Sequence, residues 1–183
     1  MIRTLSSRVA YENPWMVLRE DSIERPDGVA GIYAVVDKPR GALVIPWDGE
    51  RIHLIGQYRY TVGRDSWEFP QGSLHDGSGV EGEQVARAEL QQETGLTAEE
   101  LHGLGAFTFA IGMSSQWCDA FLATGLHQGE ASPDPEEVGL RTRAVTVAEL
   151  EAELRSGEIF DAATLAGWQL LSLDPALRTF VGK

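Results

Sequence analysis

Residues 85–97 read Val-Ala-Arg-Ala-Glu-Leu-Gln-Gln-Glu-Thr-Gly-Leu-Thr, and this segment carries more structural information than any other part of the chain. The pattern predicts a helix that Gly95 ends, because glycine readily adopts the left-handed conformation of a helix C-cap. Glu89 and Glu93 are four residues apart and therefore project from one face of that helix. Two like charges there repel each other, but hard cations such as Mg²⁺ prefer oxygen ligands of this kind. The pair is a candidate metal site, although an isolated pair is also typical of a solvated helix face.

The length and composition limit the classes of protein to which this chain can belong. The chain has 183 residues, enough for one domain with a real core, and its 43% hydrophobic and 23% charged residues are typical of a soluble globular protein. No apolar run reaches the roughly 18 residues that a membrane span needs. The first eight residues lack the apolar core of a signal peptide, and Cys118 is the only cysteine. We therefore expect a cytoplasmic protein without membrane partners.

The net charge of −13 indicates the kind of partner. Such a field repels the phosphates of a nucleic acid, so a DNA- or RNA-binding role is not expected. A small phosphorylated substrate is compatible with this charge, because a metal ion and a few arginines can invert the potential locally.

The order of predicted elements indicates an α+β fold. Apolar periodicity and turn signals predict strands at 15–18, 31–36, 42–46, 51–60, 103–110, 118–124 and 138–145 and helices at 147–156 and 162–173. Residues 61–80 are rich in glycine and proline and are expected to be loop. Ser78 and Glu81 have the spacing of a capping box, which predicts that the central helix begins near Gly79.

The segment from Gly72 to Leu96 resembles the Nudix box, G-x5-E-x7-R-E-U-x-E-E-x-G-U, where U is aliphatic. Flanking segments resemble the ADP-ribose pyrophosphatase branch of that family, at residues 57–60, 67–72, 121–126 and 157–162. The resemblance extends from about Tyr11 to Leu173. It implies a mixed β-sheet sandwiched between helices with a small N-terminal antiparallel sheet. We expect an N-terminal β region over 1–45, which forms a homodimer by strand exchange, and a catalytic domain over 46–183.

The resemblance also implies an activity. Such enzymes are hydrolases that use Mg²⁺ or Mn²⁺ to cleave the diphosphate bond of a nucleoside diphosphate linked to another moiety, of the ADP-ribose or nucleotide-sugar type. Metal ions neutralise phosphate oxygens and lower the pKa of bound water. By the resemblance Glu89 and Glu93 ligate the metal together with the backbone carbonyl of Gln71, and Glu68 is a further possible ligand. Glu93 is also expected to be needed for turnover.

The general base and the substrate contacts are less sharply indicated. Glu136 and Glu137 lie where a loop glutamate of this branch often activates water, and Glu137 is slightly favoured; the alternative is an exposed acidic turn. Arg59 could pair with a phosphate or could be a surface strand residue. Arg64 is a weaker candidate for substrate binding. Trp67 could stack on a base, although core packing is the favoured interpretation.

The box departs from the family pattern. Ala88 replaces its arginine, Val80 its first glutamate and Gln92 one glutamate of its final pair, and Gly72 lies two residues too far from Glu89. A local shift could let Arg87 or Glu81 supply the missing charges. We expect looser metal binding, and the alternative function is a catalytically weak or inactive nucleotide-binding regulatory module.

One substrate marker is also missing. The ADP-ribose group carries a proline about sixteen residues after the box glycine, where this chain has Ile111. That difference weakens ADP-ribose as the specific substrate and leaves nucleotide sugars, CDP-alcohols and dinucleotides open.

Overall fold

The computed structural model describes residues 1–73, 81–132 and 139–182. Its strands are β1 (Arg3–Asn13), β2 (Met16–Glu24), β3 (Ala30–Asp37), β4 (Gly41–Pro46), β5 (Ile52–Arg59), β6 (Arg64–Glu68), β7 (Gln71–Gly72), β8 (Leu96–Thr108), β9 (Trp117–Gln128) and β10 (Arg141–Val145). Its helices are α1 (Gly82–Thr94), α2 (Val147–Ser156), α3 (Ala162–Leu173) and α4 (Arg178–Val181). The α+β class predicted from the sequence is confirmed.

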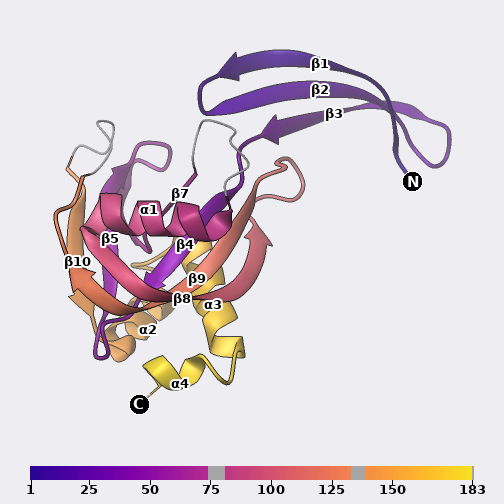
Figure 1. Cartoon of the computed structure of the whole chain (residues 1–183). Coiled ribbons are helices and arrows are strands. Elements are labelled where there is room, and N and C mark those ends of the chain that lie inside the picture. Colours follow the sequence, from indigo (N-terminus) through magenta and orange to yellow (C-terminus); the bar gives the residue numbers. More distant parts are fainter. Residues whose placement is uncertain (74–80, 133–138, 183) are drawn as a thin grey trace.

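Three sheets organise the strands (Figure 1). A mixed four-stranded sheet in the order β7-β4-β9-β8 forms the centre, where β4 and β9 run parallel and the other pairs antiparallel. A second sheet has the order β10-β5-β6. The antiparallel sheet β1-β2-β3 forms an arm that extends away from the body, as the indigo and purple strands of Figure 1 show.

Strand β4 lies at the centre of the core, and each of its residues is buried. Successive side chains of a strand point to opposite faces of the sheet. Leu43 and Ile45 accordingly join the hydrophobic cluster that contains residues of α3, whereas Ala42 and Val44 join the cluster that contains residues of α1. The two helices therefore cover opposite faces of the central sheet, which confirms the predicted mixed sheet between helices (Figure 1).

Helix α1 begins three residues later than predicted. Its N-cap is Glu81, which makes no side-chain capping bond, and Ser78 of the predicted capping box lies outside the described residues. Gly82 sits so close to Asp119 that a Cβ there would lie 2.4 Å from its Oδ2. The start of the helix is therefore set by its packing on β9. Its end is as predicted, because Gly95 has a φ of 73° and its N–H donates to Gln91.

Several strand predictions need correction. The region 61–80, expected to be loop, contains β6 and β7, and β8 begins at Leu96, directly after α1, instead of at 103. β1 was not predicted, because Ser7 interrupts the alternation of its apolar residues Leu5, Val9 and Tyr11. Helices α2 and α3 have the predicted bounds.

Hydrogen bonds to segment 112–116 join the arm to the body. β3 bonds the body through Val36, whose N–H donates to Met113 O at 2.8 Å and whose carbonyl accepts from Ser115 N at 3.1 Å. β4, which runs across the predicted boundary at residue 45, pairs with β9 in the central sheet. The division into 1–45 and 46–183 stays a prediction. No helix in the described ranges combines the length and apolar character needed to cross a membrane.

Candidate active site

A cleft with a volume of about 540 Å³ opens where the β5–β6 hairpin, β7 and the start of α3 meet. Both polar and aromatic side chains border it. Among the described residues its wall contains Lys38, Arg59, Ser66, Glu68, Gln71, Gly72, Phe109, Gln116, Cys118, Phe160 and Asp161. Burial raises the pKa of the Cys118 thiol to about 12, so this thiol is protonated and a poor nucleophile at neutral pH.

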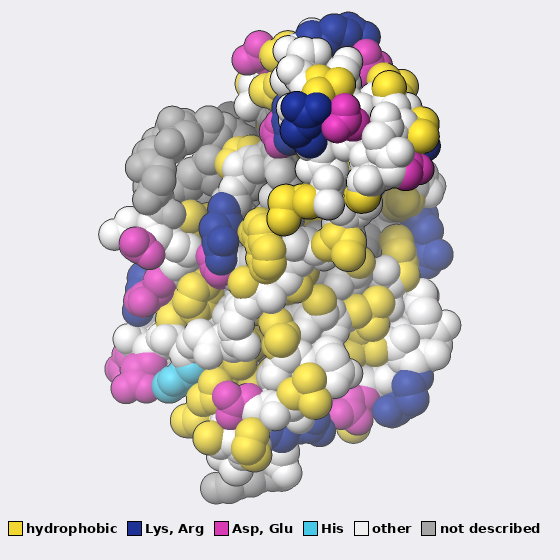
Figure 2. Space-filling view, turned by 90° about the vertical axis from the view of Figure 1, so that its right-hand side faces the viewer, with side chains coloured by type: hydrophobic (Ala, Val, Ile, Leu, Met, Phe, Trp, Pro, Cys, Tyr) yellow, Lys and Arg dark blue, Asp and Glu magenta, His cyan; other side chains and the backbone are white. Residues whose placement is uncertain are grey.

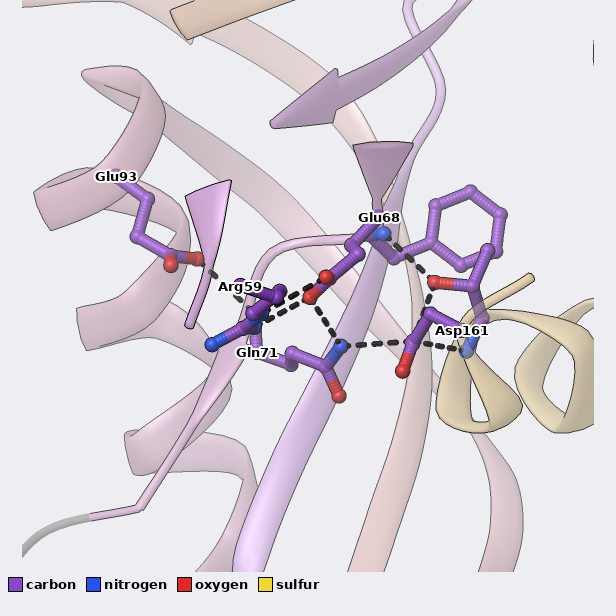
Figure 3. Close-up of polar contacts among 7 residues, drawn as sticks. Arg59, Glu68, Gln71, Glu93 and Asp161 are labelled. Carbon is purple, nitrogen blue, oxygen red and sulfur yellow. Dashed lines mark hydrogen bonds and ion pairs between the residues drawn. The ribbon is translucent and has the colours of Figure 1, made fainter. Parts of the chain in front are cut away.

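Glu68 is held in the cleft by Arg59. Arg59 Nε donates to Glu68 Oε1 at 2.8 Å, and Arg59 Nη2 donates to Glu68 Oε2 (Figure 3). The carboxylate is only 2% exposed, and such a buried charge needs a partner of opposite sign. These bonds raise the pKa of Arg59 above its usual value, mainly because they stabilise the charged guanidinium. The two residues predicted for substrate binding and metal binding therefore pair with each other.

Gln71 connects both sides of the site. Its backbone N–H donates to Glu93 Oε2 at 3.0 Å, on the α1 side. Its side-chain Nε2 donates to Glu68 Oε2 at 3.2 Å and to Asp161 Oδ2 at 2.9 Å, on the α3 side. Figure 3 shows Gln71 between the two helices, with its amide directed toward Asp161. The carbonyl predicted as a metal ligand thus belongs to a residue whose position is well defined.

Glu89 lies against the backbone of Gly72, the residue after Gln71. A Cβ on Gly72 would lie 2.3 Å from Glu89 Oε1, and a Cβ on Gly41 would lie 2.7 Å from the Gly72 carbonyl oxygen. β7 is thus tightly enclosed between β4 and α1. Glu89 and Glu93 are 8% and 1% exposed, so neither belongs to a solvated helix face. The structure brings the four predicted metal-binding residues to the same segment, 68–72.

The donor set fits a particular kind of metal. No group of three or more His, Cys, Asp or Glu side chains among the described residues is arranged to hold a metal ion. Mg²⁺ does not require such a cage, because it commonly binds one or two carboxylates and keeps waters or substrate phosphates as its other ligands. Two buried carboxylates beside backbone carbonyls are compatible with that mode.

Asp161 is a residue of the site that the sequence reasoning missed. It is the N-cap of α3, and its Oδ2 accepts from Thr164 N and from Thr164 Oγ1, each at 2.8 Å. Thr164 Oγ1 in turn accepts from Phe69 N at 3.0 Å. A sequence signal existed, because an aspartate three residues before a threonine at a helix start is a capping pattern. That signal does not show which distant segment the cap also binds.

The remaining predicted residues lie away from this centre or outside the described chain. Trp67 lies on β6 between the cleft residues Ser66 and Glu68 and is not part of the cleft wall. Arg143 stacks on its ring, with the guanidinium carbon 4.2 Å from the ring centroid. Arg64 stacks on Phe160, a residue of the cleft wall, at 4.3 Å. Glu136 and Glu137 lie outside the described residues.

The structure directs Arg87, one of the two residues expected to supply a missing charge, away from the cleft. Arg87 donates to Glu83 on its own helix and, through Nη1, to the Ala98 carbonyl at 2.9 Å. Its charge is therefore directed toward β8. Glu81 serves as the N-cap of α1 without a side-chain capping bond.

Comparisons with known proteins agree with this geometry. The family model of the NUDIX domain matches residues 37–166, and that of the nucleoside diphosphate sugar hydrolase N-terminal domain matches 2–36. An ADP-ribose pyrophosphatase of Mycobacterium tuberculosis is 31% identical over 90% of this chain and 80% of its own length. One of Bacillus subtilis is 29% identical over 96% of this chain and 95% of its own.

Two further similarities extend the comparison. A methanol dehydrogenase activator of Bacillus methanolicus is 26% identical over 96% of this chain and 95% of its own length. The crystal structure of an ADP compounds hydrolase superposes with a TM-score of 0.82, covers 93% of this chain and 92% of its own, and shares 19% identity. The last similarity concerns the fold.

Proposed function

The chain belongs to the Nudix family, in its ADP-ribose pyrophosphatase branch, and from this premise we propose that it cleaves the diphosphate bond of ADP-ribose or a nucleotide sugar with Mg²⁺ or Mn²⁺. As a Nudix pyrophosphohydrolase it acts on a nucleoside diphosphate linked to another moiety. Beyond this family activity, the proposal adds a dependence on a divalent metal and narrows the substrate class to ADP-ribose or nucleotide sugars.

One observation carries the metal dependence. Glu89 and Glu93 are buried on one face of α1, and their carboxylates meet the backbone of Gly72 and Gln71. Carboxylate oxygens one helical turn apart, beside backbone carbonyls, are the kind of ligand that hard divalent cations prefer. Bound there, Mg²⁺ or Mn²⁺ would neutralise phosphate oxygens and acidify water. Glu89, Glu93 and the Gln71 carbonyl would hold it, with Glu68 as a further ligand.

Arg59 is proposed to bind the substrate. Its described bonds to Glu68 use Nε and Nη2. Since a guanidinium has donors on three nitrogens, Nη1 can donate to a phosphate oxygen while the pair with Glu68 remains. Arg64 and Trp67 are weaker proposals, because each already stacks within the protein. By the family resemblance, Glu137 or Glu136 takes the proton of the attacking water.

The test is a screen of nucleoside diphosphate compounds with each metal, followed by product chromatography. We expect turnover of at least one ADP-linked or sugar-linked compound, abolished by EDTA. Glu93→Gln should lower kcat by at least about 100-fold while the thermal midpoint stays near that of the wild type. Glu83→Gln is the matched control on the exposed side of α1 and should retain full activity. Equal activity of both variants would contradict the proposal.

The second candidate function is nucleotide binding without cleavage. It is favoured by Ala88 and Val80, which replace charged residues of the family box, and by the direction of Arg87 toward β8. In that case a nucleotide would bind, as calorimetry would show, and would stay intact after prolonged incubation with Mn²⁺.

We also propose that the protein is a cytoplasmic homodimer. Exposed apolar side chains support a second copy as partner of the arm. They include Leu5, Val9 and Tyr11 on β1 and Ile32 on β3, each more than half exposed. Figure 2 shows further hydrophobic side chains on the body below the arm. Exposed apolar side chains that gather into a contiguous patch are typical of an interface.

A further inference from the structure

Hydrogen bonds from two sides hold the segment that carries Glu68 and the Gln71 carbonyl. On one side, Glu93 of α1 accepts from the Gln71 N–H at 3.0 Å. On the other side, Thr164 Oγ1 accepts from Phe69 N at 3.0 Å and Asp161 Oδ2 accepts from Gln71 Nε2 at 2.9 Å. Only the first of these contacts involves a residue of the family box.

Helix α3 is a rigid support for the second contact. A Cβ on Gly167 would lie 2.7 Å from Leu43 Cδ2, so the helix packs directly on the central strand β4. Ala163, Thr164 and Leu171 are completely buried in the same interface. A helix packed so closely cannot shift without disturbing the core. The position of Asp161 relative to the sheet is therefore well determined.

A single oxygen of Asp161 joins the helix to the segment. Its Oδ2 accepts the N-cap bond from Thr164 N, the hydroxyl of Thr164 and the amide of Gln71 (Figure 3). The cap orients the Thr164 hydroxyl, which then has its lone pairs available for Phe69 N. Removing the carboxylate would free both contacts at once, because each depends on the same atom.

We propose that Asp161 is a positioning residue for hydrolysis, which acts through Thr164 and Gln71 to hold residues 68–71 in register with Glu89 and Glu93. This inference rests on the proposed metal-dependent function. Ligands need their supporting partners to stay within a fraction of an ångström of the productive geometry. Loss of such partners typically lowers metal affinity or activity by about 10- to 100-fold.

The variants separate two roles of Asp161: its hydrogen bond with the Gln71 side chain, called the bridge here, and its cap of helix α3. Asp161→Ala removes both, whereas Gln71→Ala removes the bridge and leaves the cap and the backbone carbonyl in place. Asp161→Asn keeps an amide oxygen as acceptor and is the conservative rescue, since Asn caps helices as well as Asp does. Thr146→Ala, which deletes the N-cap of α2, is the matched control for the loss of a cap away from the cleft.

Three readouts are taken on the full chain: amide hydrogen exchange at Gln71, Mn²⁺ affinity by calorimetry, and kcat with KM. Asp161→Ala and Gln71→Ala should speed exchange of the Gln71 amide. They should also weaken Mn²⁺ binding and lower kcat, each by about 10-fold or more, with little change in KM. Asp161→Asn should recover most of each loss. Thr146→Ala should lower the thermal midpoint alone.

The outcomes distinguish the two proposals. Unchanged Gln71 exchange in Asp161→Ala would overturn the inference, and so would faster exchange with unchanged Mn²⁺ affinity and kcat. A wild-type protein that neither binds Mn²⁺ nor turns over any compound would refute the proposed function. In that case an exchange effect would still show that Asp161 orders the segment, whereas the positioning role in hydrolysis would be overturned.

Discussion

Gly72 is the residue on which the geometry of the cleft depends most directly. It has no side chain, and this absence lets the carboxylate of Glu89 approach the backbone of β7. The sequence already shows that Gly72 lies two residues too far from Glu89 for the family box. The structure shows that Gly72 and Glu89 nevertheless meet.

Gly72→Ala should therefore disturb the proposed metal site. The added Cβ would lie 2.3 Å from Glu89 Oε1, so the carboxylate must move away from the segment. We expect Mn²⁺ affinity to fall by about 10-fold or more and stability to fall by about 1–3 kcal/mol, the usual cost of overpacking. Calorimetry and urea denaturation measure the two effects. Gly103→Ala, where nothing lies within 4 Å of the new Cβ, is the control and should change neither.

At the scale of the element, side-chain caps stabilise the first turns of helices α2 and α3. α2 begins with a capping box in which Thr146 and Glu149 satisfy each other, and α3 begins with the Asp161 cap. The bounds of both helices were predicted correctly, and each cap involves residues only three apart. α1 differs, since its start is set by the contact of Gly82 with Asp119, which Arg40 holds through bonds of 2.5 and 2.6 Å. That contact joins residues far apart in sequence, so the predicted start was wrong.

The capping box of α2 leads to a prediction about pH. The Thr146 backbone N–H and then its hydroxyl donate to Glu149, and they hold the pKa of this carboxyl below its usual value of 4.5. A depressed pKa means that the contribution to stability is present above that usual value and is lost as pH falls through the lower folded-state value. Glu149→Gln should therefore lower the thermal midpoint at pH 7.

The difference between wild type and Glu149→Gln should shrink as the pH falls below about 4, as calorimetric melting curves would show. The same comparison in a Thr146→Ala background should give a smaller difference at pH 7, because one of the two donors is absent. A difference that stays constant from pH 7 to pH 3 would contradict this explanation.

At the scale of the whole molecule, packing against the body does not account for the stability of the arm. Among the described strands β1 pairs with β2 alone, and ten of its eleven residues are exposed. Ion pairs such as Arg3–Glu24 and Arg8–Glu20 cross the arm at its surface, where each contributes little. A three-stranded sheet with so little buried surface is marginal by itself. A second chain that covers its apolar side chains would account for its length.

We expect the protein to run at twice its 20.0 kDa mass in light scattering after size-exclusion chromatography. Ile32→Asp, on the arm, should shift the population toward monomer, because a buried charge at an interface is costly. Leu173→Asp is the control at the end of α3, where the side chain is similarly exposed at 70% against 68% for Ile32. A wild-type protein that is monomeric at every concentration would remove the basis for the homodimer.

Local chemistry made part of this molecule readable from its sequence. The helical spacing of Glu89 and Glu93, the C-cap at Gly95 and the bounds of α2 and α3 follow from patterns within short segments, where covalent geometry determines which groups meet. The family resemblance added the mixed sheet, which the structure confirms, and the metal-binding role proposed for the 68–72 segment.

The tertiary structure alone decided which of those groups share a site. Arg59 pairs with Glu68, and Gln71 reaches Asp161, 90 positions further along the chain. Arg87 turns to β8 instead of the cleft. Such contacts depend on how α1 and α3 pack on the two faces of β4, and packing is a property of the whole core, which no short segment contains.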